Sequence, residues 1–432
     1  MSAPLALVLD YRRTGKYAFH TLVGSLETDP ETREVPVDFV PRADDLAEAV
    51  AARLRRAERV LVCWSFYSAD FLAIAARLAS LRERVQDPRV LHLAGGVHAS
   101  AEPRACLETG FDLVAVGEGE ETIRSVVRAL LAGEDPRGLR GVASLEEGEL
   151  RLAGRARPVD LDAFPPFAPA HDRLGPIEIT RGCIYACRFC QTPYMNRARF
   201  RHRSPENVFR WVEHLVGRGF RDFRFISPTS LSYGAQGPEP CLERLEALLA
   251  GVRERIGPAR RLFYGTFPSE LRPEHVTPEA LALLRRYVDN RDIILGAQSG
   301  SEAVLERSKR GHGVDVIERA VAVSLQAGFT PHVDFIFGLP GEGPAEAAAS
   351  LELARSLAER GARVHGHTFL PLPGTPFRDE APGRLSAETR AALERLASRG
   401  RLYGQWKRQE SIATDLAALR RPGPRRLPST DS

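Results

Sequence analysis

The chain has 432 residues, 43% of them hydrophobic and 27% charged, so it is long enough for two globular domains with large cores. Its 60 Lys and Arg residues against 56 Asp and Glu residues give a net charge of +4, too small to indicate nucleic acid or an anionic membrane as a partner. No stretch reaches the roughly 18 uncharged apolar residues of a membrane span, and the N-terminal apolar run is too short for a signal peptide. We therefore expect a cytoplasmic protein without a membrane partner.

Up to about residue 135, short apolar runs alternate with amphipathic segments. The amphipathic segments, such as 43–57 and 68–85, carry apolar residues at helical spacing. Strands alternating with helices predict an α/β domain with a doubly wound parallel sheet of the Rossmann or flavodoxin type. The five predicted strands are residues 5–11, 35–40, 59–66, 89–96 and 111–119.

A second series of strands and helices spans residues 176–380. Six such units predict a partial (β/α)6 barrel, shorter than the eight-unit form. Residues 136–175, rich in proline and aspartate, are expected to form an extended linker. Residues 381–420 are expected to be a helical C-terminal extension, and residues 421–432 a disordered tail. The predicted barrel strands are residues 176–181, 222–227, 262–267, 293–298, 333–338 and 364–370.

Three of the six cysteines, Cys183, Cys187 and Cys190, follow the first predicted barrel strand within eight positions. This end of a barrel is where barrel enzymes place their chemistry, and clustered thiols favour metal or redox chemistry over a disulfide framework. A structural zinc site needs four ligands, for which His202 is the available fourth. A [4Fe–4S] cluster held by three thiolates instead leaves one iron open to a small molecule, and the CxxxCxxC spacing favours this interpretation.

The segment CIYACRFC resembles the signature of the radical S-adenosylmethionine (SAM) enzymes. Residues 296–312, 334–342 and 367–376 are similar to later barrel motifs of cobalamin-binding radical SAM proteins and methylthiotransferases. The resemblance implies that the open iron binds SAM and that an electron from the cluster cleaves SAM to a 5′-deoxyadenosyl radical. Ser227 stands where the family usually has a Gly-Gly-Glu run, so the chain departs from the family there. The SAM contacts that the resemblance implies are Phe189, Ser227, Gln298, Ser299 and Gly338.

The first domain resembles the cobalamin (B12)-binding module that precedes such barrels. The DxHxxG motif of that module is matched by DYRRTG, in which Asp10, Arg12 and Gly15 keep the spacing but arginine replaces the cobalt-ligating histidine. A guanidinium has no lone pair for a metal, so Arg12 cannot act as an imidazole does. The alternative is a purely structural domain. The resemblance implies further cobalamin contacts at Ser65, Gly95, Gly96, Gly117, Glu118 and Gly119.

Three further residues are candidates for catalysis. His365 and His367 alternate on the last predicted barrel strand, so both side chains face one side, into the barrel. They are either proton-transfer or substrate groups or hydrogen-bonded interior histidines. Cys241 follows a long loop at the barrel mouth and is either a radical or methyl relay or a buried thiol. The basic loop 197–204 either binds a substrate carboxylate or phosphate or is simply solvated.

These features favour a cobalamin-dependent radical SAM enzyme that methylates an unactivated carbon, with a [4Fe–4S] cluster, SAM and cobalamin as cofactors. We expect a small-molecule or peptide substrate and an external electron donor of the flavodoxin or ferredoxin kind. A radical SAM oxidoreductase or cyclase that does not use methylcobalamin is the alternative among enzymes. A non-catalytic metal- or cobalamin-binding protein is the alternative outside them.

Overall fold

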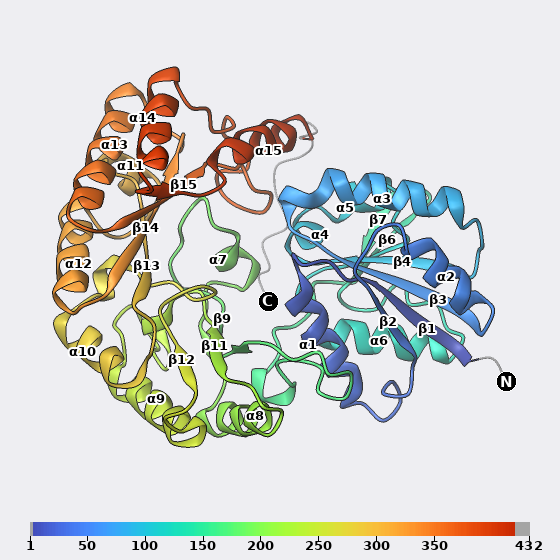
Figure 1. Ribbon diagram of the computed structural model, residues 1–432. Coiled ribbons are helices and arrows are strands. Elements are labelled where there is room, and N and C mark those ends of the chain that lie inside the picture. Colours follow the sequence, from blue (N-terminus) through green and yellow to red (C-terminus); the bar gives the residue numbers. More distant parts are fainter. Residues whose placement is uncertain (1–2, 420–432) are drawn as a thin grey trace.

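A computed structural model describes residues 3–419 as two α/β domains side by side (Figure 1). The predicted tail at residues 421–432 lies outside the described residues. Within residues 3–419, no helix combines the length and the apolar character needed to cross a membrane.

The first domain is built on a seven-stranded sheet in the order β2-β1-β3-β4-β5-β6-β7, parallel from β2 to β5. Successive side chains of a strand point to opposite faces, so Val8 and Val62 pack under α2 and α3, whereas Leu7 and Leu61 pack under α1 and α6. The strands are β1 (Ala3–Asp10), β2 (Val37–Val40), β3 (Ala57–Ser65), β4 (Val90–Gly95), β5 (Leu113–Ala115), β6 (Val142–Glu146) and β7 (Glu149–Leu152). The helices are α1 (Lys16–Glu27), α2 (Leu46–Leu54), α3 (Phe71–Arg84), α4 (Val97–Ala101), α5 (Pro103–Glu108) and α6 (Glu120–Leu131).

The strand order reverses at β1, which has β2 on one side and β3 on the other. In open α/β sheets, ligands bind beyond the carboxyl ends of the strands at such a point. The five predicted strands are confirmed, and four of their carboxyl ends carry the residues expected to contact cobalamin.

Part of the predicted linker belongs to this sheet instead. β6 and β7 form a hairpin that pairs antiparallel with β5, turning at Glu147 and Gly148, which both have positive φ. Every residue of β7 is at least partly exposed, so the hairpin lacks the continuous apolar run that marks the other strands. Residues 153–176 are the part that connects the domains.

The second domain is a partial barrel of parallel strands with helices along its outer side (Figure 1). Strands β12-β11-β8 form one group and β13-β14-β15-β16 the other, joined by a bridge between Leu271 and Leu295. Its strands are β8 (Ile177–Glu178), β9 (Thr180–Arg181), β10 (Arg201–His202), β11 (Asp222–Ile226), β12 (Arg261–Phe263), β13 (Asp292–Gln298), β14 (Thr330–Phe337), β15 (Arg363–Thr368) and β16 (Leu402–Tyr403). Its helices are α7 (Gln191–Met195), α8 (Pro205–Gly217), α9 (Leu242–Ile256), α10 (Pro278–Tyr287), α11 (Glu302–Arg307), α12 (Val314–Gln326), α13 (Pro344–Glu359), α14 (Ala387–Ser398) and α15 (Trp406–Ala418).

The six predicted barrel strands are confirmed, with two differences. The first is divided into β8 and β9, because β9 turns away to pair antiparallel with β10. The C-terminal extension, expected to be wholly helical, contributes the short strand β16, which lies parallel to β15. Two residues are too few to produce a periodic pattern in the sequence.

Candidate active site

The three clustered cysteines lie on the loop that leaves β9, at the carboxyl end of the barrel strands. Gly182 begins this loop with φ +83°, and the close approach of the Arg199 carbonyl leaves no room there for a side chain. Cys187 is buried, whereas Cys183 and Cys190 are partly exposed, and all three are free thiols. The Cys190 N–H donates to the Cys187 carbonyl at 3.1 Å, which fixes a turn between these two residues.

The three sulfur atoms are not gathered around the position of a single ion. Within the part of the chain that the structure describes, the three sulfurs are not all within 4.8 Å of one another, although the Cys183 thiol is near enough to feel the charges of the other two. A single zinc ion would hold its sulfur ligands about 4 Å apart. His202 is committed elsewhere, because its Nδ1 bonds to Thr180 Oγ1 at 3.0 Å and its Nε2 to the Ala235 carbonyl at 2.9 Å.

Two buried arginines flank Cys187. Its Sγ lies 3.8 Å from Nη1 of Arg272 and 3.7 Å from Nη1 of Arg310. Arg272 pairs with Glu274, whereas Arg310 donates to the Gly296 carbonyl and has no carboxylate within 4 Å among residues 3–419. Arg310 interacts with the carboxyl groups of Glu270 and Glu274 only at longer range, and a cluster ligated by thiolates would add negative charge beside both guanidinium groups. The donor set therefore fits a [4Fe–4S] group.

Metal binding at this loop is coupled to proton release. Burial raises the pKa of Cys183 to about 11 and also raises the pKa of Cys190. Since metals bind the thiolate and not the thiol, occupation of the site must displace these protons.

Of the residues expected to contact SAM, Phe189 is partly exposed and Gln298 is buried. Phe189 is partly buried against a small apolar cluster that includes Leu339 and Phe369. Gln298 ends β13 at a bulge, with φ +80°. A non-glycine residue in this conformation is strained, and such strain is found preferentially at functional sites.

The other three residues expected to contact SAM are Ser227, Gly338 and Ser299, and they make contacts within the protein. The buried Ser227 hydroxyl donates to the Thr229 carbonyl at 2.9 Å. Gly338 has φ +75° and approaches the backbone of residues 383–384 too closely to carry a side chain. Ser299 is fully buried and bonds to Ser350 of α13 at 3.2 Å, and its contact with SAM stays a prediction.

The residues expected to contact cobalamin converge where the strand order reverses. Arg12 Nε donates to the buried Asp10 carboxylate at 2.9 Å, and Arg12 Nη2 donates to the Ser65 carbonyl at 3.3 Å, across the ends of β1 and β3. Asp10 also pairs with Arg77, yet burial raises the pKa of Asp10 despite both arginines. The Arg12 side chain is therefore held at the point where the sheet would present a ligand.

Glycines at the neighbouring strand ends allow these turns to approach the end of β3 closely. Gly15 and Gly96 have φ of +83° and +94°, and a Cβ at either position would meet a β3-end carbonyl oxygen within about 3 Å. Gly95 lies beside Gly96, whereas Gly117 and Gly119 follow β5 and pack against Ala156 and Leu22. Close packing against the protein is thus one reason for the last two glycines.

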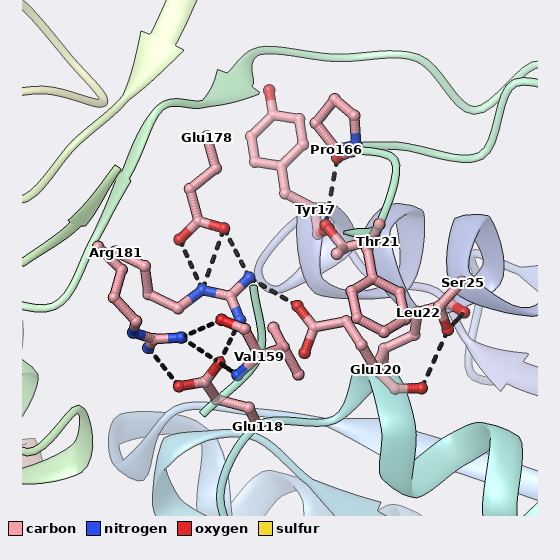
Figure 2. A network of polar contacts seen from close by, with 12 residues as sticks. Tyr17, Thr21, Leu22, Ser25, Glu118, Glu120, Val159, Pro166, Glu178 and Arg181 are labelled. Carbon is pink, nitrogen blue, oxygen red and sulfur yellow. Dashed lines mark hydrogen bonds and ion pairs between the residues drawn. The ribbon is translucent and has the colours of Figure 1, made fainter. Parts of the chain in front are cut away.

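Glu118, also expected to contact cobalamin, instead joins the two domains (Figure 2). Its carboxylate accepts hydrogen bonds from Arg181 Nη1 and Arg201 Nη1, each at 2.9 Å, and from the Val159 N–H at 3.1 Å. Arg181 also pairs with Glu120 at 2.7 Å and with Glu178 at 2.6 Å. Arg181 stands two residues before Cys183, so this network ties the cysteine loop to the first domain.

A second contact brings the two candidate cofactor sites together. Gln191, which follows Cys190, donates from Nε2 to Ser68 Oγ at 3.4 Å and to the Pro373 carbonyl at 2.7 Å. Ser68 follows the end of β3, and α7 packs beside α4 (Figure 1). The strand ends of the first domain therefore face the cysteine loop.

The histidine candidates do lie on the inner side of the barrel, as expected. His365 Nδ1 is 2.8 Å from Asp334 Oδ1 and 3.2 Å from His367 Nε2. Cys241 is partly exposed at the start of α9, after a loop whose Pro238 carbonyl accepts from Tyr185 of the cysteine loop. Sequence patterns did not reveal Asp334, Arg272 or Arg310, although Arg310 lies within segment 296–312 and Asp334 within segment 334–342, both of which carry the family resemblance.

The comparisons with known proteins agree with this geometry. The Radical SAM superfamily model matches residues 177–354, and the B12 binding domain model matches residues 33–127. The uncharacterized protein MK0932 of Methanopyrus kandleri is 25% identical over 396 residues, 77% of this chain and 72% of that protein. The tRNA-2-methylthio-N(6)-dimethylallyladenosine synthase of Sorangium cellulosum is 30% identical over 311 residues, 65% of this chain but only 61% of the synthase.

Two solved structures share the two-domain fold. The radical SAM methyltransferase TsrM from Kitasatospora setae, with cobalamin and a [4Fe–4S] cluster bound, is 18% identical and has a TM-score of 0.68, covering 88% of this chain and 74% of TsrM. The cobalamin-dependent radical SAM enzyme OxsB, with aqua-cobalamin bound, is 16% identical and has a TM-score of 0.64, covering 82% of this chain and 52% of OxsB.

The fold and the cysteine loop define a radical SAM enzyme. A B12 binding domain lies ahead of the radical SAM domain, so the chain has the domain combination of the cobalamin-binding radical SAM enzymes. The cofactors of this class, a [4Fe–4S] cluster with SAM and cobalamin, are those expected from the sequence.

Proposed function

We propose that the protein transfers a methyl group to an unactivated carbon of a small molecule or peptide. When bound, the cluster with SAM supplies the radical that removes a hydrogen atom, and cobalamin carries the methyl group. The observation that supports this proposal is the contact between Gln191 and Ser68, because it places the strand ends of the B12 binding domain against the cysteine loop. Two cofactors can act on one substrate only if they face the same space.

The chain's own residues would have separate tasks in this reaction. Cys183, Cys187 and Cys190 would hold the cluster, with the Arg272 and Arg310 guanidinium groups beside Cys187 offsetting its negative charge. Phe189 and Gln298 would contact SAM, and the ends of β1, β3 and β4 would hold cobalamin without a histidine ligand from the position of Arg12. An acidic flavodoxin- or ferredoxin-like protein would supply electrons.

The test requires no knowledge of the substrate. Full-length protein reconstituted without oxygen is given cobalamin, a reductant and SAM with a ¹³C-labelled methyl group. The proposal predicts both release of 5′-deoxyadenosine and transfer of the label to added cob(I)alamin. Release of 5′-deoxyadenosine without labelled cobalamin would contradict methyl transfer and support the oxidoreductase or cyclase alternative. Neither product, together with one zinc per chain, would indicate a binding protein without turnover.

A further inference from the structure

We propose that Asp334, His365 and His367 form a divalent cation site inside the barrel, separate from the three cysteines. Oδ1 of Asp334, Nδ1 of His365 and Nε2 of His367 all lie within 4.8 Å of one another, and no other His, Cys, Asp and Glu side chains in residues 3–419 form such a set. The two measured separations are 2.8 Å and 3.2 Å. Neighbouring ligands of an ion with bonds of about 2.1 Å lie about 3.0–3.4 Å apart, so the 3.2 Å separation falls within this range and the 2.8 Å separation lies slightly below it.

The sheet fixes these three side chains. Asp334 and His365 stand directly opposite one another on the adjacent parallel strands β14 and β15. His367 is two residues further along β15, so it shares the face of His365. Ligands carried on paired strands within a four-stranded group hold their geometry better than ligands on loops.

Hydrogen bonding leaves the cluster unsatisfied without an ion. The Thr368 N–H donates to Gln409 Oε1 at 3.0 Å, so the Gln409 NH₂ faces His367 Nδ1 at 3.2 Å. His367 Nδ1 must then accept, which puts the proton of the neutral ring on Nε2, pointing at His365 Nδ1. The same His365 nitrogen faces the Asp334 carboxylate, and one ring nitrogen cannot accept from His367 and donate to Asp334 at once.

An ion resolves this conflict, because it accepts a lone pair from each of the three ligand atoms. The proton of His367 then moves to Nδ1, and the Gln409 amide must turn to accept it, giving up its bond to Thr368. In its present orientation, the Gln409 amide therefore opposes binding of the ion. Once the amide has turned, it accepts a hydrogen bond from His367 and stabilises this histidine as a metal ligand.

A second carboxyl group, Glu270, and the Arg310 guanidinium both lie near enough to interact with the site. Burial and then the charge of Asp334 raise the pKa of Glu270 to about 7, while Arg310 and His365 act in the opposite direction. The Tyr403 ring stacks on His365 with the ring centroids 4.5 Å apart. The Tyr403 hydroxyl bonds to His332 Nδ1 at 2.8 Å, so neither Tyr403 nor His332 adds a positive charge that would oppose a bound cation. Two carboxyl groups thus share this part of the barrel.

The ligand types indicate which ion would bind. Two imidazoles and one carboxylate suit Zn²⁺ or Fe²⁺ better than Mg²⁺ or Ca²⁺. Three protein ligands leave coordination positions open, as in catalytic metal sites. An oxygen or nitrogen donor of a substrate could occupy them. The proposal does not rest on methyl transfer and stands or falls separately.

Zinc alone is the probe in the test. Full-length, cluster-reconstituted protein is freed of loosely bound ions and titrated with Zn²⁺ by calorimetry, and its iron content is measured before and after. We expect one Zn²⁺ per chain with the iron retained, and binding weakened more than about 100-fold in His365→Ala and Asp334→Asn, since even outer partners of a metal site change affinity 10–100-fold. His171→Ala is the control and should bind normally, because His171 pairs with Glu27 of the first domain and not with the three proposed ligands.

The Gln409→Glu variant gives a test in which zinc binding should become tighter, not weaker. A carboxylate accepts both the Thr368 N–H and a proton on His367 Nδ1, so this variant should bind Zn²⁺ about tenfold more tightly. Absence of zinc binding, or binding that survives in His365→Ala, would overturn the proposal. So would binding that is lost in Cys183→Ala but unchanged in Gln409→Glu, because the ion would then belong to the cysteine loop.

Discussion

Arg12 shows how a single residue limits the chemistry of a cofactor. It stands where the B12-binding module usually offers a histidine to cobalt, and its guanidinium is held by Asp10 and by the Ser65 carbonyl. It has no lone pair to donate, so the protein supplies no nitrogen ligand from this position. Under the proposed function, the strand ends would bind the corrin by shape and hydrogen bonds.

Electron paramagnetic resonance can test this residue directly. In protein loaded with cob(II)alamin, labelling every histidine with ¹⁵N should leave the cobalt spectrum unchanged, because no histidine is a ligand. In Arg12→His the same label should alter the nitrogen splitting, which shows that the method can detect a ligand. A label effect in the unsubstituted protein would contradict the account and point to another histidine.

The cysteines make a second prediction at the residue scale. Cys187→Ala should lower the iron bound after anaerobic reconstitution from about four per chain to less than one, because two ligands cannot hold the cluster. Cys241→Ser is the matched control, since Cys241 lies at the start of α9, outside the cysteine loop. Equal iron loss in both variants would indicate general damage and not loss of a ligand.

The two-residue strand β9 contributes strongly to the contact between the two domains. Arg181 ends this strand and pairs with Glu118, Glu120 and Glu178 across the domain junction. Although burial alone would raise the pKa of Glu120, the Arg181 guanidinium lowers it overall. The strand thus positions the cysteine loop through ionic contacts with the first domain.

Replacing Arg181 should therefore be costly. Arg181→Gln leaves three carboxylates without their shared partner, and we expect a loss of about 3–5 kcal/mol in the free energy of unfolding measured with urea. The control is Arg218→Gln, because Arg218 pairs with Asp172 at the surface. An exposed pair contributes less than about 1 kcal/mol. Similar losses in both variants would show that the junction network does not stabilise the fold.

The sequence predicted those elements whose signal is local. β1 and β3 are continuous apolar runs between polar turns, and the structure confirms them. β16 and the hairpin of β6 and β7 were not predicted, because they are short and partly exposed and are stabilised by pairing with strands already in place. Tertiary pairing of this kind leaves little trace in the sequence of the segment itself.

At the scale of the whole molecule, buried histidines make the fold sensitive to acid. Burial lowers the pKa of His20, His92 and His98 to about 4, from the ordinary value of 6.5. Between these values the unfolded chain binds more protons than the folded chain, so stability is complete above pH 6.5 and is lost as the pH falls toward 4.

Urea unfolding between pH 7 and pH 5 tests this dependence. Each histidine should contribute a decrease of up to about 1.4 kcal/mol per pH unit, and His98→Gln should reduce the slope by one such contribution. An unchanged slope in His98→Gln would contradict the buried, neutral state of His98, and this comparison cancels the opposite contribution of Glu270 and Glu342, whose pKa values burial raises to about 7.

The site was predictable only where its residues are neighbours in sequence. Cys183, Cys187 and Cys190 share one loop, and His365 and His367 share one strand, so spacing alone marks them. Arg272 and Arg310 reach Cys187 from 85 and 123 residues away, and Asp334 meets His365 only when β14 and β15 pair. These contacts form only when the barrel strands pair, so no local pattern in the sequence predicts them.

The central claim is that three thiolates hold a cluster with one open iron. The most direct measurement is electron paramagnetic resonance of the reconstituted, dithionite-reduced protein before and after addition of SAM. We predict the signal of a reduced [4Fe–4S] cluster, changed in shape when SAM binds the open iron. Absence of a cubane signal, or a cubane signal that SAM leaves unchanged because a fourth side chain completes it, would contradict the account.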